Sequence, residues 1–258
     1  MNDTRLKRLS LLMVRNIVEE FSKSEFTPAF FELNTNGKDG NPAPMQFVLK
    51  DQTRVSFSGI IDRVDVLKKD GEVYIRIVDY KTGTKQFSLE DVRHGINIQM
   101  LLYLFTLCRQ TDTDFCKALG LQEGQSPTPA GVVYLSANIP VIQSEDYESE
   151  SDILEQASDS LKRSGLLLND EEILYAMNED LSSHFLAGIK RNKDGDLVGS
   201  ALTDRESFRT LYDQILDTVE TITQKLRGGV ADATPIPYKG KDPCAYCTMK
   251  PICRRIEE

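Results

Sequence analysis

An Asp-Gly turn between two extended runs places the strongest constraint on how this chain can fold. Apolar and polar side chains alternate from Thr53 to Ile61, and a second run rich in β-branched residues extends from Val73 to Val78. The dipeptide Asp70-Gly71 between them is typical of a tight turn that joins two antiparallel strands. The sequence therefore predicts a β-hairpin, and both of its strands end in acidic sequence, at Asp62 and at Asp79.

Helices and further strands are predicted on both sides of this hairpin. Helical periodicity indicates an amphipathic helix over residues 5–23, and Ser88 is typical of the N-cap of a helix that extends to about Arg109. A capping-box pattern that begins at Thr203 predicts a helix to about Arg227. Strands are predicted at residues 29–33, 47–49 and 129–136. We expect a single domain with a core over about 28–136, an acidic helical segment at 143–180, a long helix at about 204–227 and a cysteine tail at 243–258.

Acidic residues are concentrated in one segment of the 258-residue chain. The formal net charge of −9 and the pI near 4.9 argue at first sight against a nucleic-acid partner. Residues 143–180, however, hold twelve acids against two bases, a net −10, so the other 220 residues sum to +1. We expect this segment to lie away from any phosphate-binding site, because it would repel the ligand there. With 40% hydrophobic residues and no long apolar run, the composition indicates a soluble globular protein without a membrane-spanning helix.

Two carboxylates and a lysine stand at the ends of the predicted hairpin strands. Asp79 and Lys81 are two residues apart, so on a strand both side chains point to one face, which Asp62 on the partner strand can also reach. Carboxylate oxygens grouped in this way suit Mg²⁺ or Mn²⁺, and a nearby lysine can orient or activate a water molecule. These residues are the minimal set for metal-assisted hydrolysis of a phosphodiester bond. Taken alone, an Asp-x-Lys pattern is also typical of solvated residues or surface ion pairs beside a hairpin.

Gln99 and Tyr103 lie four residues apart on the helix predicted after Ser88, so both occupy one face of it. A glutamine on a helix that is otherwise rich in Leu and Met needs a polar partner, and the tyrosine hydroxyl can supply it. An ordinary pair at the boundary of the core would show the same spacing, and the pattern alone favours that interpretation.

Three of the five cysteines, Cys244, Cys247 and Cys253, form a C-x2-C-x5-C pattern near the end of the chain. Thiolates at this spacing are typical of ligands for a soft metal centre, and both tetrahedral zinc and a cubane iron–sulfur cluster need four ligands. The fourth must be Cys108 or Cys116 or lie in sequence that this chain lacks. Cys108 and Cys116 fall on or after a predicted core helix and are expected to be buried apolar residues. An odd number of cysteines without a signal peptide indicates a reducing compartment, the cytoplasm.

In their order and spacing these motifs resemble the RecB-type branch of the PD-(D/E)xK nucleases. The resemblance rests on Gly59-Ile-Ile-Asp62-Arg63-Val-Asp65, Ile77-Val-Asp79-Tyr80-Lys81-Thr-Gly83 and Gln99-Met-Leu-Leu-Tyr103. The downstream sequence resembles the C-terminal nuclease domain of AddB-type helicase–nuclease subunits. That part of the resemblance rests on Pro129-Ala-Gly-Val-Val-Tyr134, on Gly165-Leu-Leu-Leu-Asn-Asp170 through Met177, and on the cysteine pattern. Together the motifs cover most of the chain.

The resemblance implies a fold, an activity and partners. The fold would be a restriction-endonuclease-like α/β core, with a mixed central sheet flanked by helices and a C-terminal cysteine-rich tail. The activity would be that of a metal-dependent DNA exonuclease domain of a helicase–nuclease, acting in double-strand-break repair and recombination. Its partners would be DNA and a subunit of AddA type. Cys244, Cys247 and Cys253 would ligate a [4Fe–4S] cluster in the full-length protein, and we expect little cluster in this chain alone.

The resemblance also implies roles within the active site. Asp62 and Asp79 would hold Mg²⁺ or Mn²⁺, with the Tyr80 carbonyl as a further ligand. Lys81 would assist the attacking water. The Gln-x-x-x-Tyr pair would support the site and contact DNA.

The chain departs from the family in two places, and both would be explained if it is the C-terminal part of a longer subunit. No cysteine precedes Cys108, whereas the family's fourth cluster ligand lies well upstream. No histidine precedes His94, although RecB-type sites often have an upstream histidine near the metal. Glu32 is a candidate in its place, or else an acid at the edge of a strand. Two other functions stay open, a stand-alone nuclease of the CRISPR-adaptation type and a catalytically silent DNA-binding module.

Overall fold

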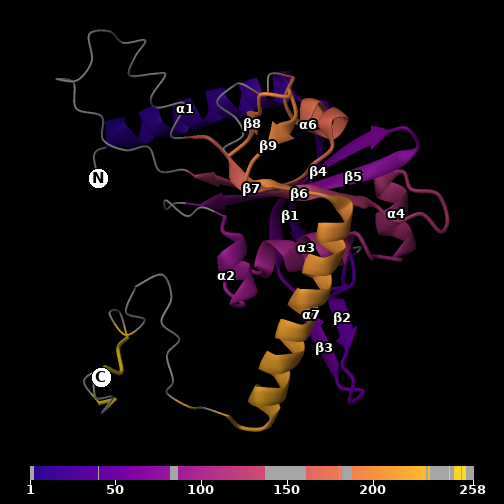
Figure 1. The fold of residues 1–258 in the computed structure, drawn as a ribbon, viewed down its shortest axis with the longest axis vertical. Coiled ribbons are helices and arrows are strands. Elements are labelled where there is room, and N and C mark those ends of the chain that lie inside the picture. Colours follow the sequence, from indigo (N-terminus) through magenta and orange to yellow (C-terminus); the bar gives the residue numbers. More distant parts are fainter. Residues whose placement is uncertain are drawn as a thin grey trace. The chain divides into compact units, whose positions relative to one another are not determined.

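The computed structural model describes residues 3–39, 41–81, 87–136, 161–179 and 188–230, together with 181, 232, 244, 247–250 and 252–253. The chain divides into two compact units, residues 1–218 and 219–258, and each is described by itself. The first unit begins with helix α1 (Asp3–Ser22) and continues through a series of strands and helices (Figure 1). No helix within the described ranges combines the length and the apolar character needed to cross a bilayer.

A mixed sheet of six strands forms the centre of the first unit, in the order β1-β4-β5-β6-β7-β10. Its strands are β1 (Thr27–Asn34), β4 (Ile60–Lys69), β5 (Glu72–Lys81), β6 (Thr128–Ser136), β7 (Ser164–Leu168) and β10 (Leu202–Thr203). β5 pairs in parallel with β6, and β10 with β7, whereas the β1–β4, β4–β5 and β6–β7 pairs are antiparallel. The expected α/β fold with a mixed central sheet and flanking helices is therefore confirmed. Two small sheets pair β2 (Met45–Val48) with β3 (Arg54–Phe57), and β8 (Lys190–Arg191) with β9 (Leu197–Val198).

The predicted hairpin is the β4–β5 pair, and both of its turn residues, Asp70 and Gly71, have positive φ, 51° and 78°. Two left-handed residues match the twist of the flanking strands, which explains the Asp-Gly pair at this turn. The run from Thr53 to Ile61, however, does not form one strand. β3 ends at Phe57 and pairs with β2, and Gly59, hydrogen bonded to Thr35, leads the chain into β4. Pairing with β2 satisfies the backbone of β3, so the run divides between two sheets.

The helix expected from Ser88 to about Arg109 is instead two helices, α2 (Leu89–Arg93) and α3 (Gln99–Leu107). Gly95 and Asn97 between them have φ of 75° and 60°. This left-handed conformation cannot continue a right-handed helix. The break places Gln99 in the first turn of α3.

Two helices begin at capping residues. Ser88 is the N-cap of α2, as predicted, and its hydroxyl accepts a backbone N–H of the first turn at 3.3 Å. Helix α7 (Arg205–Arg227) begins with the Asp204 carboxylate accepting the N–H of Ser207 at 2.6 Å. Thr203, the first residue of the predicted capping box, belongs to β10. Strand pairing with β7 thus moves the cap by one residue.

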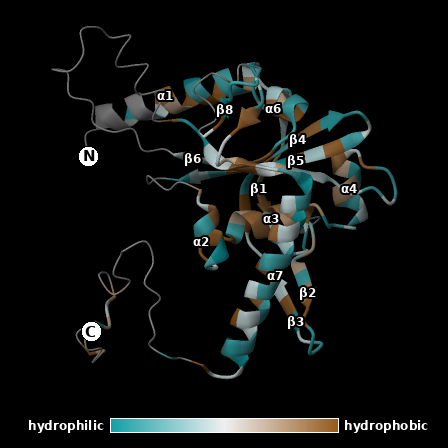
Figure 2. Ribbon diagram, in the orientation of Figure 1, coloured by the Kyte–Doolittle hydropathy of each residue, from teal (hydrophilic) through white to brown (hydrophobic). Residues whose placement is uncertain are grey.

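Helices cover both faces of the central sheet (Figure 1). α1 and α6 (Glu171–Met177) lie on one face, and α2, α3 and the first turns of α7 lie on the other. α3 is the apolar helix of the second face, with Leu101 and Leu104 fully buried, and Figure 2 shows hydrophobic residues along it. α4 (Thr113–Leu119) follows α3 and buries Phe115.

Most of the acidic segment, residues 143–160 and 180, lies outside the described residues, as does Gly83 of the second motif. Its expected separation from the site therefore stays a prediction. The described part, residues 161–179, contains β7 as well as α6, where helices and loops had been expected. A short buried apolar run such as Gly165–Leu168 has no periodicity that separates a strand from a helix, and pairing with β6 and β10 decides the matter.

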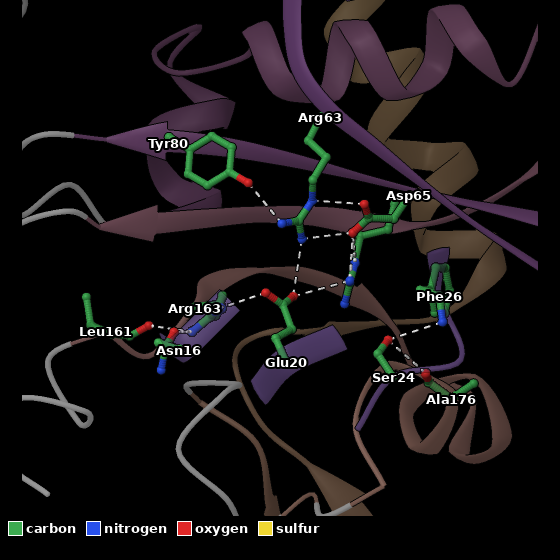
Figure 3. Close-up of polar contacts among 11 residues, drawn as sticks. Asn16, Glu20, Ser24, Phe26, Arg63, Asp65, Tyr80, Leu161, Arg163 and Ala176 are labelled. Carbon is green, nitrogen blue, oxygen red and sulfur yellow. Dashed lines mark hydrogen bonds and ion pairs between the residues drawn. The ribbon is translucent and has the colours of Figure 1, made fainter. Parts of the chain in front are cut away.

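A cluster of buried charges joins α1 to the face of the sheet that α1 covers (Figure 3). Two carboxylates, Glu20 and Asp65, lie among three guanidinium groups, those of Arg63, Arg76 and Arg163. All five side chains, which we call the buried charge cluster, are at most 5% exposed. Arg63 and Arg76 contact both carboxylates, and Arg163 lies 2.8 Å from Glu20. Because an unpaired buried charge costs several kcal/mol, each member depends on the others.

The helix expected over residues 5–23 is confirmed as α1, but its most buried described side chains are polar. Asn16 and Glu20 are buried, whereas Met13, Ile17 and Phe21 are only half-buried. Asn16 accepts a hydrogen bond from Arg163, one of the two bases in the acidic segment. Arg163 is therefore a core residue rather than a surface charge.

The three guanidinium groups lower the pKa of Glu20 from 4.5 to about 2. Burial alone would raise this pKa, but attraction to Arg163, Arg76 and Arg63 outweighs the effect of burial. The pKa is thus lower in the folded chain than in the unfolded chain. The stability that Glu20 contributes is therefore fully present above about pH 4.5 and is lost as the pH falls toward 2.

We expect Glu20→Gln to lower the free energy of unfolding at pH 7 by about 3–5 kcal/mol, because it removes one partner from a buried ion network. Urea unfolding at pH 7 and at several lower pH values measures the difference from the wild-type chain. The difference should shrink as the pH falls through the range between the two pKa values. Glu19→Gln, at a side chain 52% exposed on the same helix, is the control and should change stability little. A difference that does not vary with pH would contradict the role of the Glu20 charge.

Candidate active site

The β4–β5 hairpin brings Asp62 and Asp79 to opposing positions on adjacent strands. Asp62 lies near the start of β4 and Asp79 near the end of β5, and the register that pairs Arg63 with Val78 places them opposite each other. Arg63 and Tyr80, the next residues along the two strands, direct their side chains into the buried charge cluster or onto it. Because side chains alternate along a strand, Asp62 and Asp79 point to the other face of the sheet. Both are half-buried.

Short contacts hold the two carboxylates in place. The backbone N–H of Tyr80 donates to Asp62 Oδ2 at 2.8 Å, so the end of β5 is tied to the start of β4. Lys81 Nζ lies 2.5 Å from Asp79 Oδ2. The Lys81 side chain is 29% exposed and that of Asp79 is 14% exposed, so solvent and a ligand can reach both. The structure thus brings together the two acids and the lysine that the sequence singled out.

Tyr134, on β6, is a residue of this site that the sequence analysis did not identify. The β5–β6 register pairs it with Asp79, and Lys81 Nζ lies 5.7 Å from the centre of its ring. Burial, with the charges of Asp79 and Asp91, raises the pKa of Tyr134 to about 12, so its hydroxyl stays protonated at neutral pH. Parallel pairing of β5 with β6 brings Tyr134 there, and no local pattern in the sequence predicts that pairing.

Gln99 and Tyr103 form a hydrogen-bonded pair at the start of α3, where Gln99 Nε2 donates to the Tyr103 hydroxyl at 2.8 Å. Gln99 is exposed, so the pair lies at the surface rather than in the core. The Tyr103 ring lies against Gly59, three residues before Asp62. A methyl group at Gly59 would overlap the hydroxyl and approach Tyr103 Cζ to 2.8 Å. The absence of a side chain at Gly59 therefore lets α3 approach the start of β4 closely.

Glu32 lies on β1 beside Asp62. The pairs Phe31–Arg63 and Leu33–Ile61 flank it, so its place in the register is opposite Asp62. Glu32 is exposed and has a φ of 49°. This left-handed conformation is uncommon for a residue other than glycine, and such residues cluster at functional sites. Its position keeps Glu32 as a candidate for the upstream acid of a metal site.

The donor set of Asp62 and Asp79 fits a hard divalent cation. Mg²⁺ is usually bound by one or two carboxylates, water molecules and substrate phosphates rather than by a cage of protein ligands. In the described part of the chain no group of three His, Cys, Asp or Glu side chains converges as a metal site. The two carboxylates would therefore supply the protein's charge, and the Tyr80 carbonyl stays a candidate for a neutral ligand.

The cysteine tail belongs to the second compact unit, and its three thiols are free. The N–H of Cys247 donates to the carbonyl of Cys244 at 3.1 Å, so these two cysteines flank one turn of the backbone. Three thiolates are one fewer than a cubane cluster needs. Cys108, in the first unit, is buried as expected, and burial raises its pKa to about 12, which disfavours the thiolate that a metal requires. Cys116 is half-buried. The described thiols therefore fit a cluster only in part.

The mixed sheet and the two carboxylates and lysine on one face of its central hairpin are the features from which a nuclease was expected. Residues 2–254 match the PD-(D/E)XK nuclease superfamily, and the chain belongs to this superfamily. Asp79-Tyr80-Lys81 has the form of the (D/E)XK element in its name.

Curated relatives match almost the whole of the chain. It is 35% identical to the B-type subunit of the ATP-dependent helicase/deoxyribonuclease of Clostridium acetobutylicum, over 97% of this chain and 21% of that protein. The proteins of the same name from Clostridium kluyveri and Acetivibrio thermocellus are 33% and 31% identical, again over 97% of this chain and 21% of each relative. The chain thus spans about a fifth of the length of these relatives.

We expect Gly59→Ala to destabilise the contact between α3 and β4 by about 1–3 kcal/mol, because the added methyl group displaces Tyr103. The double variant Gly59→Ala/Tyr103→Phe should recover part of this loss. It removes the overlapping oxygen but leaves ring carbons 2.8 and 3.0 Å from the new methyl group. Thermal unfolding followed by circular dichroism measures both, with Ser58→Ala, at an exposed neighbour, as the control. Equal losses in the single and double variants would argue against this contact.

Proposed function

We propose that this chain is a metal-dependent deoxyribonuclease domain of an ATP-dependent helicase–nuclease, and that it acts as an exonuclease in double-strand-break repair and recombination. The observation that carries the proposal is the position of Asp62, Asp79 and Lys81 together on the β4–β5 hairpin of a PD-(D/E)XK superfamily member. Similarity to the B-type subunits of helicase/deoxyribonucleases supports DNA as the substrate and a subunit of AddA type as the partner. The same similarity favours this assembly over a stand-alone nuclease of the CRISPR-adaptation type.

Asp62 and Asp79 would hold Mg²⁺ or Mn²⁺, with the Tyr80 carbonyl as a further ligand. When bound, the cation would polarise a phosphoryl oxygen and lower the pKa of a water molecule. The N–H of Tyr80 keeps the Asp62 carboxylate oriented toward the site. The Lys81 ammonium donates a hydrogen bond to the attacking water or to the scissile phosphate, and its charge offsets the charge that develops there. The electron-rich face of the Tyr134 ring restricts the position of that ammonium group.

The Gln99–Tyr103 pair lies where a DNA strand would enter the site. Tyr103 contacts the residue from which β4 begins its approach to Asp62, and Gln99 presents its carboxamide to solvent. A carboxamide with one N–H committed to Tyr103 retains another donor and its carbonyl oxygen for a phosphate, sugar or base. We therefore assign Gln99 to contact with DNA and Tyr103 to support of Gln99.

Digestion of end-labelled linear single-stranded DNA by the 258-residue chain tests the proposal. We expect digestion to require Mg²⁺ or Mn²⁺, and Asp79→Asn and Lys81→Ala each to lower the rate at least about a hundredfold. Asp70→Asn, the same change at the far end of the hairpin, is the matched control and should retain wild-type activity. Unchanged digestion by Asp79→Asn and Lys81→Ala would refute the active site. DNA binding without digestion by the wild-type chain would instead support the catalytically silent module.

Iron content tests the expectation for the cysteine tail. After anaerobic reconstitution we expect this chain to retain well under the four irons per chain of a complete cubane cluster, because three local thiolates leave one iron without a protein ligand. Iron and sulfide assays with visible absorbance measure the occupancy, and Cys247→Ser is the control for bound metal. A stable cluster with four irons per chain would contradict this expectation. Cys108→Ala would then show whether Cys108 is the fourth ligand.

A further inference from the structure

A cavity of about 300 Å³ lies between α3, the start of β6 and the first turns of α7. Its walls combine aromatic rings with guanidinium groups, from Phe105, Arg109, Arg205, Phe208, Arg209 and Tyr212. The volume is at the lower end of the range for small organic ligands, about 300–1,000 Å³. None of these residues belongs to the site around Asp79, which lies at the opposite end of β5 and β6.

Arg109 and Tyr212 form a flat platform at this cavity. The guanidinium carbon of Arg109 lies 3.4 Å from the centre of the Tyr212 ring. Phe105 meets that ring nearly edge-on, at 5.3 Å and 81°, which holds it in place. Arg109 is exposed, so the outer face of its guanidinium plane is open to a ligand. Nucleobases stack on guanidinium planes and aromatic rings of this kind.

The cavity also carries positive charge that the protein does not neutralise. In the part of the chain that the structure describes, neither Arg109 nor Arg209 has a carboxylate partner. Arg205 is already engaged, by Glu72 at 3.1 Å and by the Tyr74 hydroxyl at 2.9 Å. Arg209 lies one turn after Arg205 on α7, near the positive end of the helix dipole. A phosphate group would therefore find an uncommitted guanidinium group beside the platform.

We propose that this cavity binds one nucleotide of a single-stranded nucleic acid, with the base stacked on Arg109 and the phosphate held by Arg209. The inference rests on the proposed function and makes the cavity a second contact for the strand that the Asp79 site cleaves. Gln99 stands at one end of α3 and Arg109 just beyond the other, and ten helical residues span roughly 15 Å. A strand that reaches both would extend along α3 for a few nucleotides.

Fluorescence anisotropy of a labelled oligothymidylate, titrated with the chain in EDTA over a range of salt concentrations, tests the proposal without any cleavage. For Arg209→Ala we expect a Kd at least about fivefold higher and a salt slope smaller by about 0.7, as for one lost phosphate contact. For Arg109→Lys, which keeps the charge but removes the plane, we expect a Kd raised roughly fivefold or more with the salt slope unchanged. Arg15→Ala, at an exposed arginine of α1 on the other face of the sheet, is the matched control.

Wild-type Kd and salt slope in both Arg209→Ala and Arg109→Lys would overturn the inference, and so would the absence of measurable binding by the wild-type chain. The nuclease assay is read separately. If the wild-type chain digests DNA while the arginine variants bind it normally, the cavity assignment fails and the nuclease stands. If the variants lose binding although the wild-type chain does not digest DNA with metal, the cavity assignment stands and the nuclease fails.

Discussion

Three guanidinium groups and two carboxylates in a protein interior can be stable only if each keeps a partner, and this requirement organises the first unit of the fold. Glu20 brings α1 and Arg163 to the same point, and Arg63 places β4 there as well. Because strand side chains alternate, a β4–β5 hairpin that buries Arg63 on one face must present Asp62 on the other. Tyr80 connects the two faces: its hydroxyl accepts from Arg63, and its N–H donates to Asp62. The orientation of the candidate metal ligand thus depends on charges buried on the far side of the sheet.

Helix α3 gives the opposite face its polarity. Its fully buried side chains, such as Leu101 and Leu104, fix it to the sheet, and this leaves its two ends for other contacts. The first turn holds the Gln99–Tyr103 pair beside the start of β4, and the far end meets α7 at an arginine-lined cavity. A sheet with carboxylates at one end and uncommitted guanidinium groups at the other suits a polyanionic strand that needs metal at one point and attraction at another. The net charge of the chain conceals this distribution.

Features that depend on neighbours in sequence could be predicted. The Asp70-Gly71 turn, the Ser88 cap and the i, i+4 pair of Gln99 and Tyr103 are set by backbone preference and short-range geometry, and the structure contains all three. The same local reasoning failed where a distant segment intervenes. The run before Asp62 divides because β2 is available to pair with its first half. Likewise the helix after Ser88 breaks at left-handed residues that hydrophobic periodicity does not reveal.

The sequence by itself determined the order of motifs, and with it the residues that chemistry would require: Asp62, Asp79, Lys81 and the cysteine pattern. Spacing along one strand is enough to place Asp79 and Lys81 on a common face, because the period of a strand is two. Only the tertiary structure decided which other groups meet them. Tyr134 reaches Asp79 through a parallel pairing, and Arg163 reaches Glu20 from the far side of the sheet. Contacts of that kind are set by the packing of whole elements and by the need to neutralise buried charge, and no local pattern encodes them.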